Sequence, residues 1–227
     1  MNRFSVVILI CFAFGTVSPV QAISLEEILN RTRQALETEK KHNADLVIEH
    51  TERFINGKVN DKGEYEKVDT VMAVVSKQGD TELNRETIYA TCAEERKRRK
   101  DRSLWEMLDD MTVDSPNYVY ELFEITDNEF VVAIAPRMEK PDKGLIDGKY
   151  YIDKESYLIN KMDFMVPRPE KLNELAMRFR FEKLDNGLYV TETMYMLGRV
   201  KVLFGIVDIR MKVKGEFFDY KVLESDE

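Results

Sequence analysis

Hydrophobic and polar residues along the chain change their spacing from a helical to a strand-like period near residue 44. Between residues 25 and 40 the apolar side chains recur every three or four positions, as they do on one face of an amphipathic helix. These positions are Leu25, Ile28, Leu29, Thr32 and Leu36. Ser24 and Glu27 have the spacing of a capping box, so the pattern predicts a helix that begins directly after Ser24.

From residue 44 onward, short runs rich in apolar residues end at residues that favour turns. The runs cover residues 44–55, 67–77, 83–93, 117–126, 129–137, 147–153, 157–166, 174–183, 188–197 and 199–222. Asn56-Gly57, Asp127-Asn128 and Asp185-Asn186-Gly187 are among the turn signals, and the first of them predicts a hairpin. The spacing predicts a mainly β (α+β) fold, in which a strongly curved antiparallel sheet forms an incomplete β-barrel behind an N-terminal helix.

The predicted sheet has one apolar face that is rich in methionine and phenylalanine. In segment 174–183, Leu175, Met177, Phe179 and Phe181 alternate with Ala176, Arg178, Arg180 and Glu182. This alternation indicates one dry and one wet face. Leu158, Met162 and Phe164 share a side elsewhere, as do Met194 and Met196. Residues 202–207 are apolar on both sides of Gly205, which indicates a bulge or a strand covered on both faces.

A second amphipathic segment follows a cationic run inside the chain. The run contains Arg96, Lys97, Arg98, Arg99, Lys100 and Arg102. Behind it, Ser103 and Glu106 repeat the capping spacing. The apolar positions of segment 103–111 then fall on one helical face, with the single tryptophan at its edge. They are Leu104, Trp105, Met107, Leu108 and Met111.

Two interpretations of this inserted helix stay open. It can pack on the sheet as ordinary core, with the cationic run as a solvated loop. It can instead form a lid over the curved apolar sheet, enclosing an adaptable cavity for long hydrophobic groups. In the second case the cationic run stands at the rim, next to anionic head groups or an anionic membrane surface.

The N-terminus has the composition of a secretory signal peptide. Arg3 precedes an apolar run over residues 4–14, and a polar stretch follows that ends in Val20-Gln21-Ala22. We expect cleavage after Ala22 and export of the remaining chain to the periplasm. That chain has 227 − 22 = 205 residues, enough for a single domain over residues 23–227, with no other segment able to span a bilayer.

Charge and chemistry exclude several classes of function. The whole chain has a formal charge of −8, which becomes −9 when Arg3 leaves, so we expect no nucleic-acid partner. Only Cys92 remains after cleavage, which excludes an internal disulfide and favours a buried, inert thiol. His42 and His50 are the only histidines and lack metal-ligand spacing, and no phosphate loop or G-x-S-x-G motif is present. We therefore expect no enzyme activity, metal or cofactor.

Three segments resemble the bacterial outer-membrane lipoprotein-sorting protein family, which belongs to the LolA/LolB-like superfamily of periplasmic carriers. They are residues 144–164, 179–196 and 213–222. The resemblance extends over residues 23–222 and is best from Tyr118 onward. It implies a curved, incomplete barrel whose mouth is closed by helices around a cavity for acyl chains. In proteins of this family an arginine can hold the lid closed, and the candidate for that role in this chain is Arg53.

Together these patterns predict a periplasmic carrier or binding protein for the acyl chains of lipoproteins or phospholipids. An inner- or outer-membrane protein is a further candidate partner, because release of the cargo requires either that the lid opens or that a partner takes the chain. The alternative is a periplasmic sensor or interaction module of the same fold, which binds a protein partner in response to lipid.

The candidate lipid-binding residues share an apolar side chain on the predicted sheet face or lid, and core packing is the alternative role for each of them. They are Trp105, Met107, Leu108, Met111, Met162, Phe164, Met177, Phe179, Phe181, Met194, Met196 and Phe204. Arg98 and Arg99 represent the basic rim, for which a solvated loop is the alternative.

Overall fold

The computed structural model describes residues 23–79, 81–91, 115–137, 145–167, 173–202 and 207–223. These residues form one helix and ten strands, so the fold is mainly β as predicted. The elements are α1 (Leu25–Ala44), β1 (Val47–Val59), β2 (Tyr65–Gln78), β3 (Thr81–Ala90), β4 (Tyr118–Ile125), β5 (Glu129–Pro136), β6 (Asp147–Asp153), β7 (Ile159–Met165), β8 (Glu174–Lys183), β9 (Tyr189–Val202) and β10 (Val207–Leu223).

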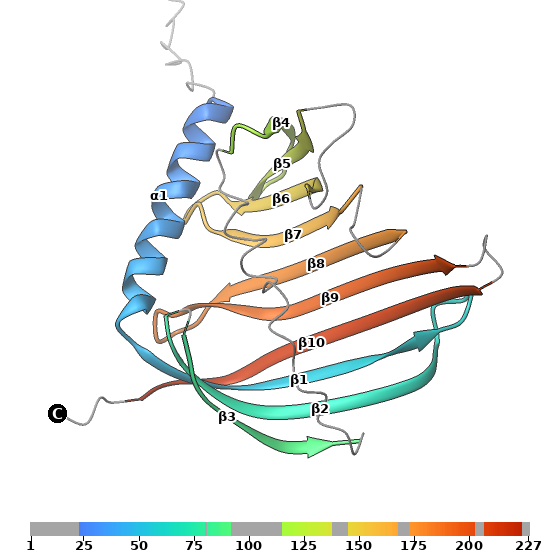
Figure 1. The fold of residues 1–227 in the computed structure, drawn as a ribbon. Helices are drawn as coiled ribbons and strands as arrows, with labels where there is room; N and C mark the ends of the chain where they lie inside the picture. Colours follow the sequence, from blue (N-terminus) through green and yellow to red (C-terminus); the bar gives the residue numbers. More distant parts are fainter. Residues whose placement is uncertain are drawn as a thin grey trace, which may run out of the picture.

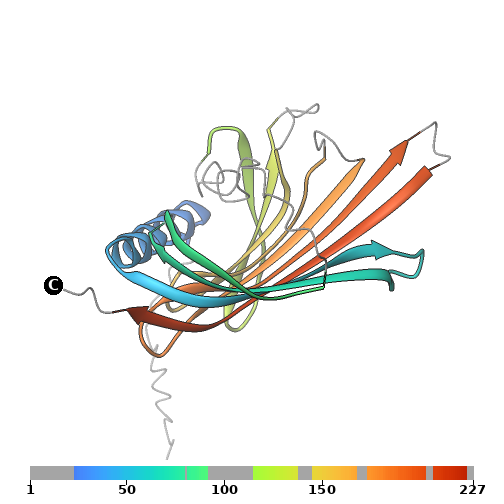
Figure 2. The same ribbon diagram turned by 60° about the horizontal axis from the view of Figure 1, so that its bottom comes forward.

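The strands form one antiparallel sheet in the order β3-β2-β1-β10-β9-β8-β7-β6-β5-β4. Consecutive strands are neighbours in the sheet, with the exception of β3 and β4, which lie at its two edges. β1 also pairs with β10, so that the first and last strands lie side by side. The sheet bends around the side on which α1 lies (Figure 2). The prediction of a curved antiparallel meander is therefore confirmed, as an open sheet with β3 and β4 at its edges.

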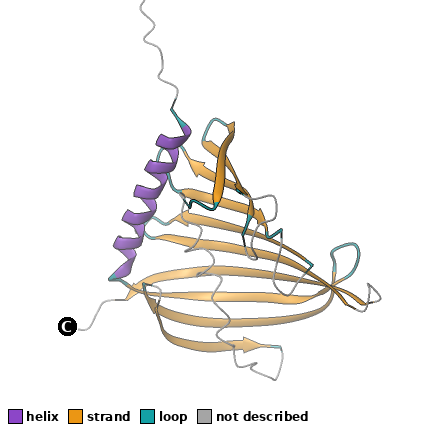
Figure 3. Cartoon of the chain, turned by 45° about the horizontal axis from the view of Figure 1, so that its top comes forward, coloured by secondary structure: helices purple, strands orange, loops and turns teal. Residues whose placement is uncertain are grey.

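The helix begins where the capping box predicts. The Ser24 side chain accepts a hydrogen bond of 3.1 Å from the backbone N–H of Glu27. α1 runs across the strands near one end of the sheet (Figure 1 and Figure 3) and continues four residues beyond the predicted end at residue 40. Ile28, Leu29 and Thr32 on its inner face are buried.

The core lies between α1 and the sheet. Ile28 and Leu29 of the helix are members of a cluster that extends from β4 to β8. Its strand and loop members are Tyr118, Phe130, Val132, Ile134, Ile146, Tyr150, Ile152, Ile159, Phe164, Val166, Met177 and Phe179. A smaller cluster of Ile48, Leu188 and Val190 lies by the start of β1. The face of the sheet that packs against α1 is called the helix-facing side below.

The predicted hairpin forms between β1 and β2, but its predicted turn at Asn56-Gly57 is wrong, because β1 continues to Val59 and the chain turns at residues 60–64. The Asn60 side chain accepts hydrogen bonds of 2.9 and 3.0 Å from the backbone N–H groups of Lys62 and Glu64. Gly63 supplies the positive φ of +77° that the turn requires. Gly57 lies in the strand, where a Cβ would clash with the carbonyl oxygen of Lys67 on β2.

The apolar run at 199–222 belongs to two strands. Val202 at the end of β9 pairs with Val207 at the start of β10, so the chain reverses between them. The predicted bulge around Gly205 lies outside the described residues, as do the signal peptide (1–22), Cys92 and the inserted helix (103–111). Within the described ranges α1 is the single helix, and no helix there is long and apolar enough to cross a membrane.

Candidate functional site

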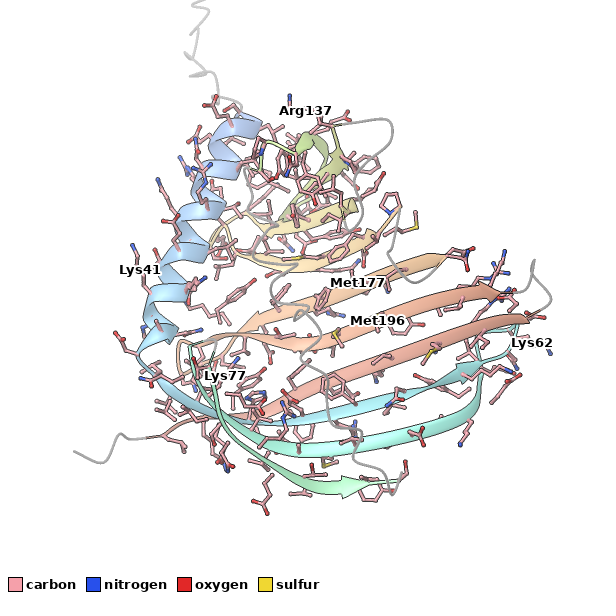
Figure 4. The ribbon with its side chains drawn as sticks, in the orientation of Figure 1. Lys41, Lys62, Lys77, Arg137, Met177 and Met196 are labelled. Carbon is pink, nitrogen blue, oxygen red and sulfur yellow. The ribbon has the colours of Figure 1, made fainter. Side chains whose placement is uncertain are left out.

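Six of the predicted lipid-binding residues lie together on the helix-facing side of β7, β8 and β9. The register forms two rows across these strands, because residues directly opposite each other in an antiparallel pair point to the same face. Phe164, Met177 and Met196 form one row, and Met162, Phe179 and Met194 form the other. These six residues are called the wall below. Figure 4 shows Met177 and Met196 side by side on β8 and β9.

The wall has three buried and three partly exposed members. Phe164, Met177 and Phe179 are buried members of the main core cluster. Met162, Met194 and Met196 are partly buried and pack against it, as does Phe181, the seventh predicted residue. The Phe179 ring stacks between Phe164 and Phe181, with centroid distances of 5.8 and 6.3 Å. The β8 residues and Phe164 of the wall are thus core, whereas Met162 on β7 and the two methionines of β9 retain accessible surface.

The remaining predicted residues lie outside the described ranges. They are Arg98, Arg99, Trp105, Met107, Leu108, Met111 and Phe204. The lid and the basic rim therefore stay predictions.

Arg53, the candidate lid-locking arginine, does not lie beside the wall. Arg53 directly precedes Phe54 on β1 and forms an ion pair with Glu216 of β10. Phe54 is opposite Gly215, which in turn is opposite Met194 of the wall. Because adjacent strand residues point to opposite faces, Arg53 is on the far side of the sheet, away from any lid over the wall.

A buried polar cluster on β1 and β3 was missed by the sequence analysis. It consists of His50, Glu52 and Arg85, and is called the polar cluster below. Arg85 Nη1 donates to Glu52 Oε2 at 2.7 Å, and His50 Nε2 lies 3.3 Å from Glu52 Oε1. Arg85 also pairs with Glu82 at 2.6 Å. His50 is only 3% exposed and Glu52 only 8%, so these groups are largely removed from water.

The environment of Glu52 keeps its carboxylate ionised. Burial acts to raise the pKa of Glu52, but hydrogen bonds from His50 and Arg85, together with the positive charge of Arg85, outweigh it. The net result lowers the pKa of Glu52 to about 2. The cluster can therefore hold a fixed pair of opposite charges inside the sheet at neutral pH.

Aromatic contacts extend from the polar cluster along β1 and β10 in the direction of the wall. The His50 ring stacks on Tyr220 with a centroid distance of 5.0 Å, and its centroid is 6.2 Å from that of Phe217. Phe217 meets Phe54 edge-on at 5.7 Å. A Cβ at Gly215 would stand 2.9 Å from the Phe54 ring, so glycine there lets the ring lie over β10 toward Met194.

Sequence periodicity could have found part of this cluster. His50, Glu52 and Phe54 alternate along β1 and so share a face with the wall. Arg85 carries no such signal, because it reaches Glu52 only through the pairing of β3 with β2 and of β2 with β1.

Two cavities are lined by described residues elsewhere. One of about 660 Å³ lies at the ends of β7–β10, beside Met165, Leu197, Arg199 and Arg210. The other, of about 400 Å³, lies between α1 and β4, beside Leu29, Arg33 and Tyr118. Neither cavity is lined by the wall or by the polar cluster. Over the described ranges, no group of three or more His, Cys, Asp or Glu side chains has an arrangement that could hold a metal ion.

No protein-family model matches the chain, and no curated protein matches it. Solved structures with a similar arrangement include a domain assigned to the outer membrane lipoprotein-sorting proteins from Vibrio parahaemolyticus, with 11% identity and a TM-score of 0.38 over 88% of this chain and 95% of that one. A LolA superfamily protein from Nitrosomonas europaea has 11% identity and a TM-score of 0.36, over 90% and 96% of the two chains.

A third similar structure is MucB in complex with the periplasmic part of MucA, with 10% identity and a TM-score of 0.30 over 89% and 100% of the two chains. The first two proteins bear the name of the family or superfamily that the sequence resembles.

Proposed function

We propose that this protein is a periplasmic carrier or binding protein for lipidated proteins or lipids, and that the wall holds their acyl chains. The observation that carries the proposal is the position of the wall, where methionine and phenylalanine from three strands share the helix-facing side. Met162, Met194 and Met196 stay partly exposed there. Unbranched methionine side chains adapt to long flexible hydrocarbons, and each buried methylene contributes about 0.8 kcal/mol.

The cellular context of the proposal comes from the sequence. Export through the predicted signal peptide would place a single domain of residues 23–227 in the periplasm. The predicted helix at 103–111 joins β3 to β4 in sequence, and these are the two edge strands of the open sheet. In this proposal that segment forms the lid, with Arg98 and Arg99 at its rim.

Native mass spectrometry of protein purified from a periplasm, followed by organic extraction of bound molecules, tests the proposal. A co-purifying acylated molecule would support it and identify the class of cargo. A clean apo mass, with no uptake from added phospholipid or acylated peptide, would mean that the wall is filled by the protein's own side chains.

A matched pair of variants locates the binding surface. Met196→Gln changes the wall, whereas Met165→Gln changes a 60% exposed methionine on the opposite face of β7. We expect only the first variant to weaken acyl binding. Equal binding by both variants would contradict a site on the wall.

The interaction-module alternative differs from the carrier in the effect of lipid binding: a carrier passes the lipid on, whereas an interaction module changes its affinity for a protein partner. A carrier should transfer acylated molecules between vesicles. A protein that never transfers lipid, yet changes its affinity for a protein partner when lipid is bound, is instead the sensor.

A further inference from the structure

We propose that the polar cluster receives the head group of the bound acylated molecule, and that this head group must present an N–H or O–H donor to His50 Nδ1. The inference rests on the proposed function, because it assigns the second half of the same site. It names the ligand as an acyl chain attached to a neutral hydrogen-bond donor, such as the hydroxyl of an acylglycerol or the amide N–H of an N-acylated amine.

The polar cluster and the wall lie on the same face of the sheet. Met162, Phe179 and Met194 of the wall continue through Gly215 to Phe54 in a single row of paired residues. Glu52 and His50 follow Phe54 at every second position along β1, whose pairing with β2 runs without a shift from Val47 to Lys58. Glu52 is therefore the charged residue nearest to Phe54 on this face of β1.

The cluster contains a buried nitrogen without a partner. His50 Nδ1 makes no hydrogen bond among the described residues, although the side chain is only 3% exposed. Buried polar side-chain atoms nearly always have a partner, and leaving one unpaired costs stability. The neighbouring Tyr220 offers only its ring face to the imidazole, because its hydroxyl donates to the backbone carbonyl of Thr191 at 2.6 Å.

The chemistry of Glu52 determines which kind of partner His50 needs. A carboxylate with a pKa of about 2 is ionised at neutral pH and can only accept hydrogen bonds. The hydrogen between His50 and Glu52 must therefore be on His50 Nε2, at 3.3 Å from the carboxylate oxygen. In the neutral ring the other nitrogen, Nδ1, is then an acceptor and requires a donor.

The charges around the site disfavour anionic head groups. Glu52 carries a negative charge next to the imidazole. Arg85 is already paired with both Glu52 and Glu82, so its charge is neutralised locally. A fatty-acid carboxylate has no donor at neutral pH and would face the charge of Glu52. Between ligands with equal chains, we therefore expect a hydroxyl or amide to bind more tightly than a carboxylate.

The experiment measures the ring nitrogens of His50 directly by ¹H–¹⁵N NMR on the ¹⁵N-labelled protein. The chain contains two histidines, so a His42→Gln variant assigns the signals of His50. Three probes with the same twelve-carbon chain are added in turn: monolauroylglycerol, N-lauroyl glycinamide and laurate. We expect a free Nδ1 before addition and a shift of its resonance with the first two probes only. We also expect those two probes to bind about tenfold more tightly than laurate.

A His50→Phe variant keeps a ring to stack on Tyr220 and removes the nitrogen, so the three probes should then bind equally. The wild-type spectra decide the outcome even if this variant folds poorly. Equal binding of all three probes to the wild-type protein, or an Nδ1 that is already hydrogen-bonded without ligand, would overturn the inference and leave the proposed function standing. If no probe binds at all, the proposed function fails as well. A shift with the glycerol probe alone or the amide probe alone identifies the source of the donor and upholds the inference.

Discussion

Replacing Glu52 with glutamine should remove a defined part of the protein's sensitivity to acid. The side chain is buried between His50 and Arg85, and its carboxylate accepts hydrogen bonds from both. Protonation of this group in acid destroys the ion pair with Arg85 inside the sheet. Glutamine has nearly the same shape but does not titrate, so it isolates this one event.

The magnitude follows from the difference between the folded and unfolded pKa values of Glu52. The pKa is lowered from 4.5 to about 2 on folding. Because the folded value is depressed, the stabilisation is complete above pH 4.5 and is lost as the pH falls toward 2. Linkage gives a loss of about 2 kcal/mol between pH 7 and pH 3, out of roughly 3 kcal/mol in total.

Urea denaturation followed by circular dichroism at pH 7 and pH 3 measures this loss. At pH 7 we expect Glu52→Gln to be less stable than wild type by about 3 kcal/mol, the low end for breaking a buried pair, because Arg85 keeps Glu82 as a partner. Between pH 7 and pH 3 the wild-type protein should then lose about 2 kcal/mol more than the variant does. Asp153 and Asp163, whose pKa values are also lowered, are present in both proteins and cancel in the comparison.

A Glu86→Gln variant is the control, because Glu86 is an exposed carboxylate on β3 near the same cluster. It should keep the pH dependence of the wild-type protein. If Glu52→Gln and wild type lose the same free energy of unfolding between the two pH values, Glu52 does not form the ion pair in solution, and the electrostatic description of the cluster is refuted.

Three further substitutions, with Met165→Ala as a control, test the packing. Phe179→Ala should lower the free energy of unfolding by about 3–5 kcal/mol, because the Phe179 side chain is only 1% exposed. Met165→Ala should lower it by less than about 1 kcal/mol, because Met165 is 60% exposed. Similar losses for the two variants would contradict the assignment of faces. Thr32→Val should raise the free energy of unfolding by about 1 kcal/mol, because the fully buried hydroxyl has no hydrogen-bond partner among the described residues. A lower melting temperature of the variant would indicate that the hydroxyl has a partner. Gly148→Ala should lower the free energy of unfolding by about 3 kcal/mol, because a Cβ would clash with the backbone of Asp163 and Phe164 on β7. An unchanged urea midpoint would rule out that close approach.

The two ends of α1 differ in what specifies them. Ser24 and Glu27 are three residues apart and cap the helix locally, so its start was predictable from the sequence. The C-terminal end has only the basic residues Lys41 and His42 in its last turn as a local signal. Glu39, before that turn, pairs with Lys183 at 2.5 Å, and in the last turn the Asn43 side chain donates to the carbonyl of Tyr189 at 3.1 Å. Both partners lie on β8 and β9, about 145 residues away in sequence, which explains why the helix extends past its predicted end.

The same distinction explains the first hairpin. Asn56-Gly57 is a strong local turn signal, but Phe54 and Val59 on either side continue to pair with both neighbouring strands. The long ladder outweighs the local preference, and the turn forms at Asn60, whose side chain binds the backbone of the next residues.

The sequence by itself determined the features that arise between near neighbours in the chain: the capped helix, the antiparallel strands, and the alternation that places the six wall residues on one face. The tertiary structure alone decided which strands meet. Pairing of β1 with β10 brings Phe54 beside Met194, and pairing through β2 brings Arg85 from β3 to Glu52. Such contacts depend on the free energy of closing long loops and of packing a whole sheet, which no short stretch of sequence contains.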